Sequence, residues 1–452
     1  MHLRNWLLLV ICCGAAAATF VRAEQSDSGR QVLLADDGFA SLGDGTIGGA
    51  SADAAHVFFV RTRAELLAAI NAGPTGAPRI INVDGVIDFN VDDNNRPLTC
   101  TDYYRDGYTR EAFLAFYNPA GPWGPNPPAN TAGSLEAARL ASAAAQSARV
   151  RMRVPDNTTI IGTDTRATLR GAWFDLRGAT TARRRNIIIR HLNFEDTYDC
   201  FPAWTPNRNA DGSWAGTGDW DSEYDSISLR ETEQVWIDHN DFRDRVTVDS
   251  TLPTFFGGKY QIHDGLVDIT NASDRVTVSW NRFVNHDKVM LIGSSDNAPG
   301  DVGRLRVTLH HNHFENVGQR APRVRYGQVH VYNNYYVIPD EVYHGYSWGV
   351  GQQPVPVASG IYAENNFFRT VKSVTPDQFI AAFTGGRGIF VAGTMHTGTV
   401  DDKDVDPLAD YNAVRDPDLA RSVGWEPTAV RWFDPTRRIP AFVEMHAGPF
   451  RW

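Results

Sequence analysis

Three arginines lie close together shortly after residue 319. Arg320, Arg323 and Arg325 fall within six positions, in the stretch RAPRVR. Guanidinium groups this close repel one another unless an anion lies among them. The spacing therefore predicts a binding site for an anion, although the chain as a whole carries a formal net charge of −10.

Two acidic stretches precede the arginines. SEYDS places Glu223 and Asp225 on one side of a strand, and HDGLVD places Asp264 and Asp268 around Gly265. A straight strand would separate the last two aspartates by ~13 Å, too far to share one ion, so the chain must bend, which glycine permits. Carboxylates without thiols favour Ca²⁺ over Zn²⁺. The alternative is that each aspartate only forms a turn or charges a strand edge.

Lysine is scarce, with only four residues in the whole chain of 452. One of them, Lys288, stands in NHDKVMLIGSSD directly before an apolar run. A functional lysine is one interpretation of this position. A surface lysine whose alkyl stem lies along apolar residues is the other.

Several histidines make zinc a competing interpretation. The residues concerned are His263, His286, His310, His311 and His313. The last three fall in one alternating strand, where neighbouring side chains point to opposite faces, and no glutamate follows at helical spacing. The sequence therefore favours calcium over zinc.

A repeated pattern organises the middle of the chain. A short β-rich alternation, a polar residue and an aromatic recur in NIIIRHLNF, QVWIDHNDF, RVTVSWNRF, RVTLHHNHF, QVHVYNNYY and GIYAENNFF. Aligning these segments places the following aromatic residues in register: Phe194, Phe242, Phe283, Phe314, Tyr335 and Phe367. The residue two positions earlier is Asn240, Asn281, Asn312, Asn333 or Asn365 in five of the six segments.

Stacked parallel coils explain the recurrent asparagine. Equivalent asparagines would lie about 4.8 Å apart, so that each amide can donate to its neighbour and satisfy buried polar atoms. The aromatic residues would stack in the core. Ordinary antiparallel hairpins are the alternative, but they do not demand one residue type in one register. We therefore predict an all-β parallel solenoid with loops of variable length.

The N-terminus has the features of a signal peptide. Residues 1–23 contain a short charged start with Arg4, an apolar run too short to span a bilayer comfortably, and a small-residue cleavage site ending at Ala23. We expect a secreted protein without a membrane partner. No linker composition divides the rest, so residues 24–452 are predicted to form one domain.

Other segments yield more local expectations. Cys100 and Cys200 remain after removal of the leader, and they form either a disulfide or two separate thiols. Residues 134–150 predict a helix with Ser134 as its N-cap. The tail after Thr399 is expected to cover the solenoid. The acidic net charge argues against a nucleic-acid partner, and we expect a monomer.

The blocks WIDHNDF, DGLVDIT, NHDKVMLIGSSD, RVTLHHNHFENV and QRAPRVRYGQVHVYNNYY together resemble those of the extracellular pectate lyases and their relatives, the pectin lyases. The resemblance runs from about Gly38 to the VGWEPTAVRWFDPT segment. It implies a right-handed parallel β-helix with an asparagine ladder.

The resemblance also implies roles for individual residues. Asp225, Asp264 and Asp268 match calcium-binding carboxylates, with Glu223 as a further candidate; Lys288 and Arg325 match substrate-binding residues, and Arg320 matches the catalytic base. Arg323 and Asp238 match structural positions. The implied substrate is polygalacturonate, and the implied reaction is β-elimination, in which the C5 proton is removed and the C4–O bond breaks.

An arginine base conflicts with the ordinary properties of the residue, since free arginine has a pKa above about 12. A basic Arg320 would require the nearby cations Lys288, Arg325 and Ca²⁺ to favour its neutral form.

Two other functions remain open. A pectin lyase would act on methyl-esterified polymer without calcium, and Trp204, Trp214 and Trp220 are candidates for stacking on a less charged sugar chain. A β-helix that only binds polysaccharide would keep the repeat but would not need Lys288 and the arginines together.

Overall fold

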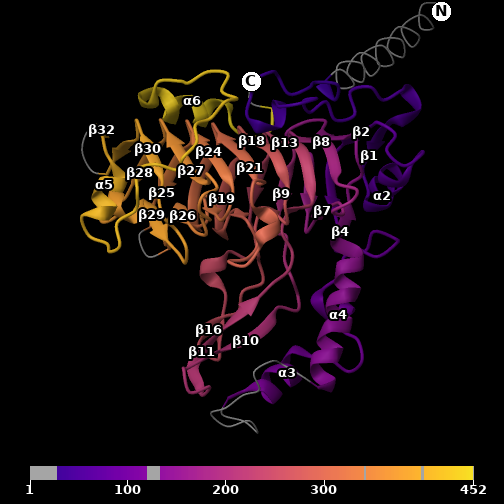
Figure 1. Ribbon diagram of the computed structural model, residues 1–452. Coiled ribbons are helices and arrows are strands. Elements are labelled where there is room, and N and C mark those ends of the chain that lie inside the picture. Colours follow the sequence, from indigo (N-terminus) through magenta and orange to yellow (C-terminus); the bar gives the residue numbers. More distant parts are fainter. Residues whose placement is uncertain (1–27, 120–132, 341–342, 399–401, 451–452) are drawn as a thin grey trace, which may run out of the picture.

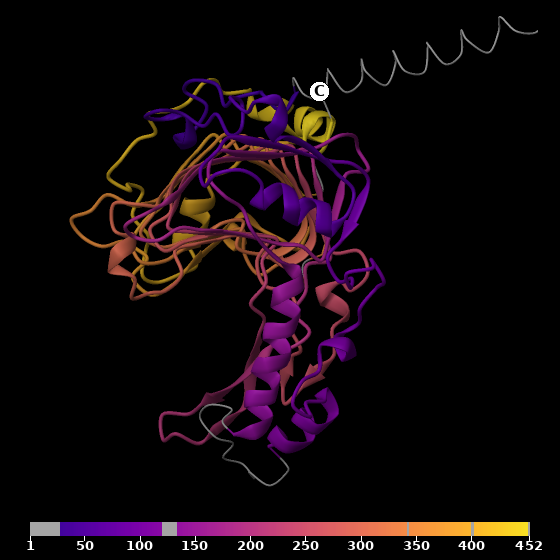
Figure 2. The same ribbon diagram turned by 90° about the vertical axis from the view of Figure 1, so that its right-hand side faces the viewer.

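The computed structural model describes residues 28–119, 133–340, 343–398 and 402–450. The predicted signal peptide lies outside these residues. Within them, three long sheets wind around a common axis, and a smaller arm extends from one side (Figures 1 and 2). No helix in the described ranges is long and apolar enough to cross a bilayer.

The coils follow one path from β7 onward: a strand of sheet II, then one of sheet I, then one of sheet III. Sheet I contains β1 (Val57–Val60), β2 (Arg79–Val83), β5 (Thr158–Gly162), β8 (Arg184–Arg190), β13 (Thr232–Asp238), β18 (Asp274–Ser279), β21 (Arg306–His310), β24 (Gln328–Tyr332), β27 (Gly360–Glu364) and β30 (Phe390–Ala392). Sheet II contains β4 (Arg151–Arg153), β7 (Trp173–Arg177), β12 (Ile227–Arg230), β17 (Val267–Thr270), β20 (Leu291–Ile292), β23 (Arg323–Val324), β26 (Trp348–Val350) and β29 (Ile380–Ala382). Sheet III contains β3 (Val86–Asp88), β6 (Thr168–Arg170), β9 (Asn193–Glu195), β14 (Asp241–Arg243), β19 (Arg282–Lys288), β22 (His313–Gln319), β25 (Tyr335–Ile338), β28 (Phe367–Thr370), β31 (Met395–Thr397) and the antiparallel edge strand β32 (Lys403–Asp404).

The predicted asparagine ladder is present between sheets I and III. Its members are Asn240, Asn281, Asn312, Asn334 and Asn366, and each amide donates to the next at 3.0–3.1 Å. Beside it runs an interior stack of Phe194, Phe242, Phe283, Phe314, Tyr336 and Phe368, with ring centroids 4.3–5.1 Å apart. The prediction of a parallel β-helix is confirmed.

The predicted register was wrong by one residue in the last two of these coils. Asn334 and Asn366 enter the ladder, whereas Asn333 and Asn365 occupy the preceding corner with φ of 51° and 52°. Each of these two coils carries two consecutive asparagines followed by two consecutive aromatics, so either asparagine can be aligned with the ladder. The corner needs the left-handed conformation, which asparagine tolerates well.

The arm is built from segments that the coils leave out. It contains α3 (Arg110–Tyr117), α4 (Ser134–Val150) and the hairpins β10 (Ala203–Arg208)–β11 (Trp214–Asp221) and β15 (Thr254–Phe255)–β16 (Gly258–Lys259). The predicted helix is confirmed as α4. Its N-cap is Gly133 rather than Ser134, which is the first helical residue.

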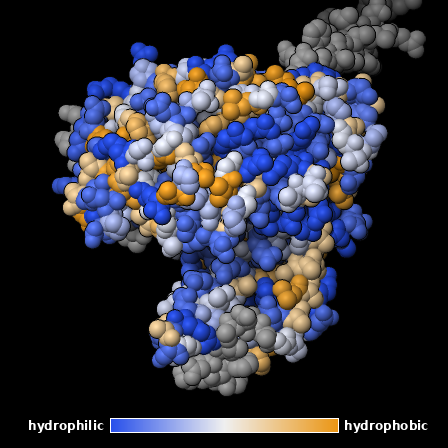
Figure 3. Space-filling view, viewed as in Figure 1, coloured by the Kyte–Doolittle hydropathy of each residue, from blue (hydrophilic) through white to orange (hydrophobic). Residues whose placement is uncertain are grey.

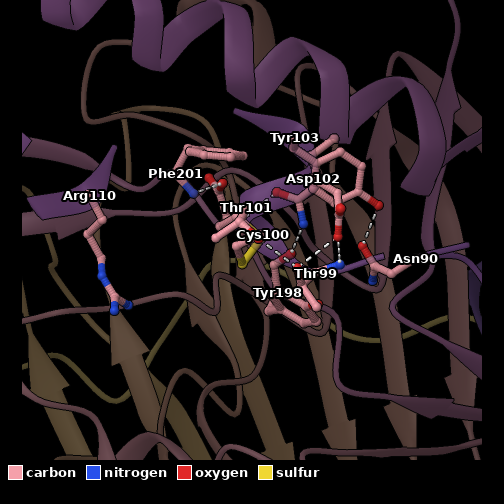
Figure 4. The surroundings of a disulfide bond; sticks show 12 residues. Asn90, Thr99, Cys100, Thr101, Asp102, Tyr103, Arg110, Tyr198 and Phe201 are labelled. Carbon is pink, nitrogen blue, oxygen red and sulfur yellow. Dashed lines mark hydrogen bonds between the residues drawn. A yellow bond between two sulfur atoms is a disulfide. The ribbon is translucent and has the colours of Figure 1, made fainter. Parts of the chain in front are cut away.

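A disulfide joins Cys100 to Cys200 at the base of the arm. Nearby, the Thr99 backbone N–H donates to Asp102 at 2.7 Å at the start of η3 (Cys100–Tyr103), and the Tyr103 hydroxyl donates to Asn90 Oδ1 at 3.0 Å (Figure 4). The alternative of two separate thiols is therefore excluded.

The two terminal regions cover the outside of the solenoid, as predicted for the tail. Backbone N–H groups of Phe39 and Ala40 donate to Thr308 and Thr277 on sheet I. Helix α6 (Ile439–His446) packs on the outward Tyr335, Phe367 and Met395 of sheet III. Helices α2 (Arg63–Asn71) and α5 (Pro407–Asn412) lie over the first and last coils, where Leu66 and Leu408 join the interior core.

Candidate functional site

Three carboxylates converge at the N-terminal ends of strands in sheet II. Asp225 precedes β12, Asp264 lies in the loop before β17, and Asp268 belongs to that strand. One oxygen of each carboxylate lies within 4.8 Å of the others. Asp225 and Asp268 are buried, so these residues form a compact acidic group rather than three separate surface charges.

Backbone and hydroxyl donors orient this acidic group. The Gly265 N–H donates to Asp225 Oδ1 at 2.9 Å, and the Leu291 N–H donates to Asp268 Oδ1 at 2.9 Å. The Ser228 hydroxyl donates to Asp225 Oδ2. These contacts direct the oxygens towards one another despite their mutual repulsion.

Gly265 is required for space rather than for an unusual backbone angle. Its φ is not positive, but a Cβ atom there would lie 2.3 Å from Asp268 Oδ1 and 3.0 Å from Asp225 Oδ1. The expected bend between Asp264 and Asp268 is present. The predicted reason, the conformational freedom of glycine, was wrong, because the carboxylates occupy the place of a side chain.

The acidic group suits a hard divalent cation. Burial, followed by the charges of Asp268 and Asp264, raises the pKa of Asp225 well above its ordinary value. Burial and then the Asp264 charge likewise raise the pKa of Asp268. A bound cation stabilises the ionised form of carboxylates whose mutual repulsion and burial oppose ionisation. The donor set consists of oxygens alone, which matches the preference of calcium.

The predicted cations lie on the same side of the solenoid. The Lys288 Nζ donates to Asp264 Oδ1 at 3.1 Å. Arg320 follows β22, and its positive charge lowers the pKa of Asp268, as does that of Lys288, although burial outweighs both. The structure therefore brings Asp225, Asp264, Asp268, Lys288 and Arg320 together.

Arg325 lies further along the sheet in a fixed orientation. Its Nε donates to Asp296 Oδ1 at 2.5 Å, and its Nη1 donates to the Gly293 carbonyl at 3.0 Å. Arg323, between the other two arginines, stacks on the Phe383 ring at 3.8 Å. Burial, then the charges of Arg325 and Arg320, lower the pKa of Arg323.

Two of the sequence candidates lie apart from this group. Glu223 is exposed, and its carboxylate is not among the clustered oxygens; its N–H donates to Asp199 at 3.3 Å. Asp238 lies on sheet I, buried in an ion pair with Arg190 at 2.8 Å, which agrees with a structural role.

A second buried cluster underlies the acidic group. His286 Nδ1 and Asp244 Oδ2 are 2.7 Å apart, and His263 Nδ1 and Asp249 Oδ1 are 3.0 Å apart. His286 also donates from Nε2 to the Asp264 carbonyl at 2.9 Å. Hydrogen bonds among its own members account for this cluster, which ties the loop of Asp264 to sheet III.

Two of the three tryptophans predicted to stack on sugar are buried in the arm. Trp204 and Trp220 are only 2% and 3% exposed, and they pack against each other in the core of the arm. Trp214 lies on the same hairpin and donates from Nε1 to the Thr217 carbonyl at 2.8 Å. The stacking prediction was wrong for Trp204 and Trp220, since their burial leaves no ring face for a ligand.

Comparison with known proteins agrees with this geometry. The family described as Pectate lyase matches residues 129–383. A pectate lyase of Bacillus subtilis is 38% identical over 429 residues, covering 94% of each chain. The chain belongs to the pectate lyase family. The predicted class of enzyme is thereby confirmed.

Solved structures of pectate lyases share the whole architecture. A thermostable pectate lyase is 40% identical, with a TM-score of 0.86 over 94% of this chain and 99% of the other. A pectate lyase bound to hexasaccharide is 37% identical, with a TM-score of 0.83 over the same shares. The pectate lyase of Acidovorax avenae subsp. citrulli is 32% identical, with a TM-score of 0.81 over 93% and 95%.

Several supporting residues were missed by reasoning from sequence. Ser228 and Trp173 form a chain to Asp225, because the Trp173 Nε1 donates to the Ser228 hydroxyl at 2.8 Å. Asp296, the partner of Arg325, ends the block NHDKVMLIGSSD and was available as a signal. Nothing in the local sequence distinguishes Ser228, whose role depends on alignment of neighbouring coils.

Proposed function

We propose that this chain cleaves polygalacturonate by calcium-assisted β-elimination. The observation that carries the proposal is the position of three carboxylates at the start of sheet II beside Lys288 and Arg320, which stand where the chain leaves sheet III. An acidic polymer binds an acidic protein only if cations lie between them. The arrangement supplies both fixed cations and a site for a mobile one.

Asp225, Asp264 and Asp268 would hold Ca²⁺ through their clustered oxygens. When bound, Ca²⁺ supplies positive charge that neutralises a galacturonate carboxylate and favours negative charge at C5. Lys288 would pair with the same carboxylate after exchanging its contact with Asp264. Arg325, held by Asp296, would pair with another carboxylate of the chain.

Arg320 is proposed as the base that takes the C5 proton. It has no ion-pair partner among the described residues, whereas Arg325 is bound to a carboxylate. Its Nε is buried without a hydrogen-bond partner in the described part of the chain. As the proton leaves C5, the electron pair forms the C4–C5 double bond and the C4–O bond breaks, leaving a 4,5-unsaturated sugar on one fragment. The departing oxygen keeps the bonding electrons, remains on C1 of the other fragment and takes a proton from water to become its new reducing end.

The site of action is proposed to be outside the cell. The N-terminal sequence supports export, and so does the Cys100–Cys200 disulfide, because disulfides persist in oxidising compartments. We further propose a monomer that acts on the polymer without a partner protein.

The proposal is tested by mixing the protein with polygalacturonate and recording ultraviolet absorbance of the conjugated product. Absorbance should rise with added Ca²⁺ and stop with a chelator. Activity on highly esterified pectin that persists in the chelator would favour a pectin lyase. Binding without any rise in absorbance would favour a binding protein.

The role of Arg320 is tested by Arg320→Lys. We expect at least a ~10³-fold loss of kcat, on the scale of removing a general base, with calcium and oligogalacturonate affinities retained. Turnover close to that of the wild type would exclude Arg320 as the base.

A further inference from the structure

The outward face of sheet II carries more arginine than the proposed mechanism uses. Arg177 at the end of β7 pairs in register with Arg230 of β12, which pairs with Thr270 of β17. The register continues through Ile269, Ile292 and Val324, so that Arg325, the next residue, occupies the same row. Arg177, Arg230 and Arg325 therefore lie along one line parallel to the solenoid axis.

A neighbouring position adds a further arginine to this end of the sheet. Arg153 of β4 lies in register with Asp175, which is in register with Ser228 and so with Asp268. We call Arg153, Arg177 and Arg230 the distal arginines. Adjacent strands are about 4.8 Å apart. The distal arginines stand on the first, second and third strands from that of Asp268, so they lie roughly 5–14 Å away from it along the sheet.

The distal arginines retain unused hydrogen-bond donors. The side chains of Arg153 and Arg177 are 64% and 38% exposed, and their Nε atoms lie 3.9 and 3.6 Å from the buried Asp175, beyond hydrogen-bonding distance. Both Asp175 oxygens lack a hydrogen bond within the described chain. Asp175 thus holds two guanidinium groups electrostatically without saturating them.

Two exposed arginines elsewhere in this acidic chain show the closer pairing that the distal arginines lack. Arg61 and Arg166 contact Asp84 and Asp164 at 2.5 Å. Arg153 and Arg177 have only the longer contacts with Asp175, so their guanidinium groups keep donors for an anionic ligand. Their position in line with Arg325 indicates a ligand that extends along the sheet.

The opposite end of the same face is uncharged. Beyond Arg323 the in-register positions are Gly349 of β26 and Ala381 of β29. The two ends of sheet II therefore differ in charge on either side of the acidic group. The space below the solenoid, beside the arm, is open in the space-filling view (Figure 3).

We propose that the distal arginines bind carboxylates of the polymer on the β4 side of the reacting bond. This inference rests on the proposed polygalacturonate substrate and extends its site. Sugars at the β4 end of sheet II must then carry free carboxylates, whereas those at the β29 end can be methyl esters. The chain would prefer polymers with runs of unesterified residues on one side of the cleavage point.

The test is affinity electrophoresis of Arg177→Gln/Arg230→Gln in gels containing polygalacturonate or fully methyl-esterified pectin. The dissociation constant for polygalacturonate should rise about tenfold, because two charge-assisted contacts are lost. Retardation by the esterified polymer, measured against a gel without polysaccharide, should match that of the wild type. Arg61→Gln/Arg166→Gln removes the same charge from other surfaces and should bind polygalacturonate as the wild type does.

Equal retardation of the wild type and the distal variant would overturn the inference. So would an equal loss in the control variant, which would indicate an effect of net charge alone. Because the gel measures binding, it is independent of turnover: a protein that is retarded through the distal arginines but produces no unsaturated product would disprove only the lyase proposal.

Discussion

The solenoid and the arm are stabilised in different ways. In the solenoid, each coil repeats the same contacts, with an amide ladder beside an aromatic stack. The arm has no such repeat and depends on an aromatic cluster including Trp204, Trp220 and Tyr260, with one disulfide at its base. A repeated contact leaves a repeated pattern in the sequence and can be predicted from it, whereas a cluster gathered from four separate segments leaves no such pattern.

The largest effect is expected from breaking the ladder. Asn281 accepts from the Asn240 N–H and amide and donates to the Ile237 and Ser279 carbonyls and to Asn312. Asn281→Ala should lower the free energy of unfolding by roughly 4–6 kcal/mol, since several buried groups lose their partners. Equilibrium unfolding in urea measures this change in the free energy of unfolding.

The exposed Asn71, which makes one hydrogen bond from helix α2, provides the control for the ladder variant. Asn71→Ala should change the unfolding free energy by less than about 1 kcal/mol. A similar loss in both variants would show that the ladder is not special.

Breaking the disulfide should affect the arm instead. Cys100→Ser/Cys200→Ser removes the closure of a 100-residue loop, which stabilises by at most ~5 kcal/mol in the chain-entropy account. We expect the arm to unfold before the solenoid, so that protease cuts near β10–β11 first. A single transition, with protease cuts spread over the whole chain, would contradict the separation of the two regions.

The site within the solenoid is sensitive to a single methyl group. Gly265→Ala places a Cβ against Asp268 and Asp225, and should weaken Ca²⁺ binding roughly 10–100-fold. Titration calorimetry measures the affinity. Gly212→Ala provides a glycine control in the arm, where no atom lies within 4 Å, although its φ of 83° costs some stability. Unchanged calcium affinity in Gly265→Ala would place the ion elsewhere.

The smallest expected effect is on the stability of the protein at acidic pH. Burial lowers the pKa of His344, in the loop before β26, to about 4. The unfolded chain therefore binds a proton that the folded chain does not, and stability falls as the pH drops from about 6.5 towards 4. His344→Gln should reduce the loss of unfolding free energy between pH 7 and pH 5 by roughly 1–2 kcal/mol. Parallel pH profiles for both proteins would contradict this assignment.

The sequence predicts the coil pattern and also the residues that the structure brings together beside Asp268. Asp225, Asp264, Asp268, Lys288 and Arg320 each lie in a distinctive block, but their role as a site stays a prediction. The wrong assignment of Asn333 and Asn365 to the ladder shows where the repeat no longer determines the register. Doubled asparagines and aromatics fit two registers, and only the conformation of the corner distinguishes them.

The arm and the supporting contacts were beyond such reasoning. Trp204 and Trp220 are aromatic residues near the site in sequence, and only their packing shows that they are core. The use of Gly265 for space, and of Ser228 as a donor to Asp225, depends on distances between neighbouring coils. These distances are set by the three-dimensional register rather than by local composition.

Helices α2 and α5 have a consequence beyond the single molecule. A parallel solenoid ends in unpaired strands, which are templates for another copy and could propagate into fibres. Here Leu66 of α2 and Leu408 and Tyr411 of α5 plug the two ends of the hydrophobic column, and β32 runs antiparallel along the last edge. The hydrophobic column is thus covered at both ends, so the repeat that makes the coils so regular does not offer its bare core to another copy.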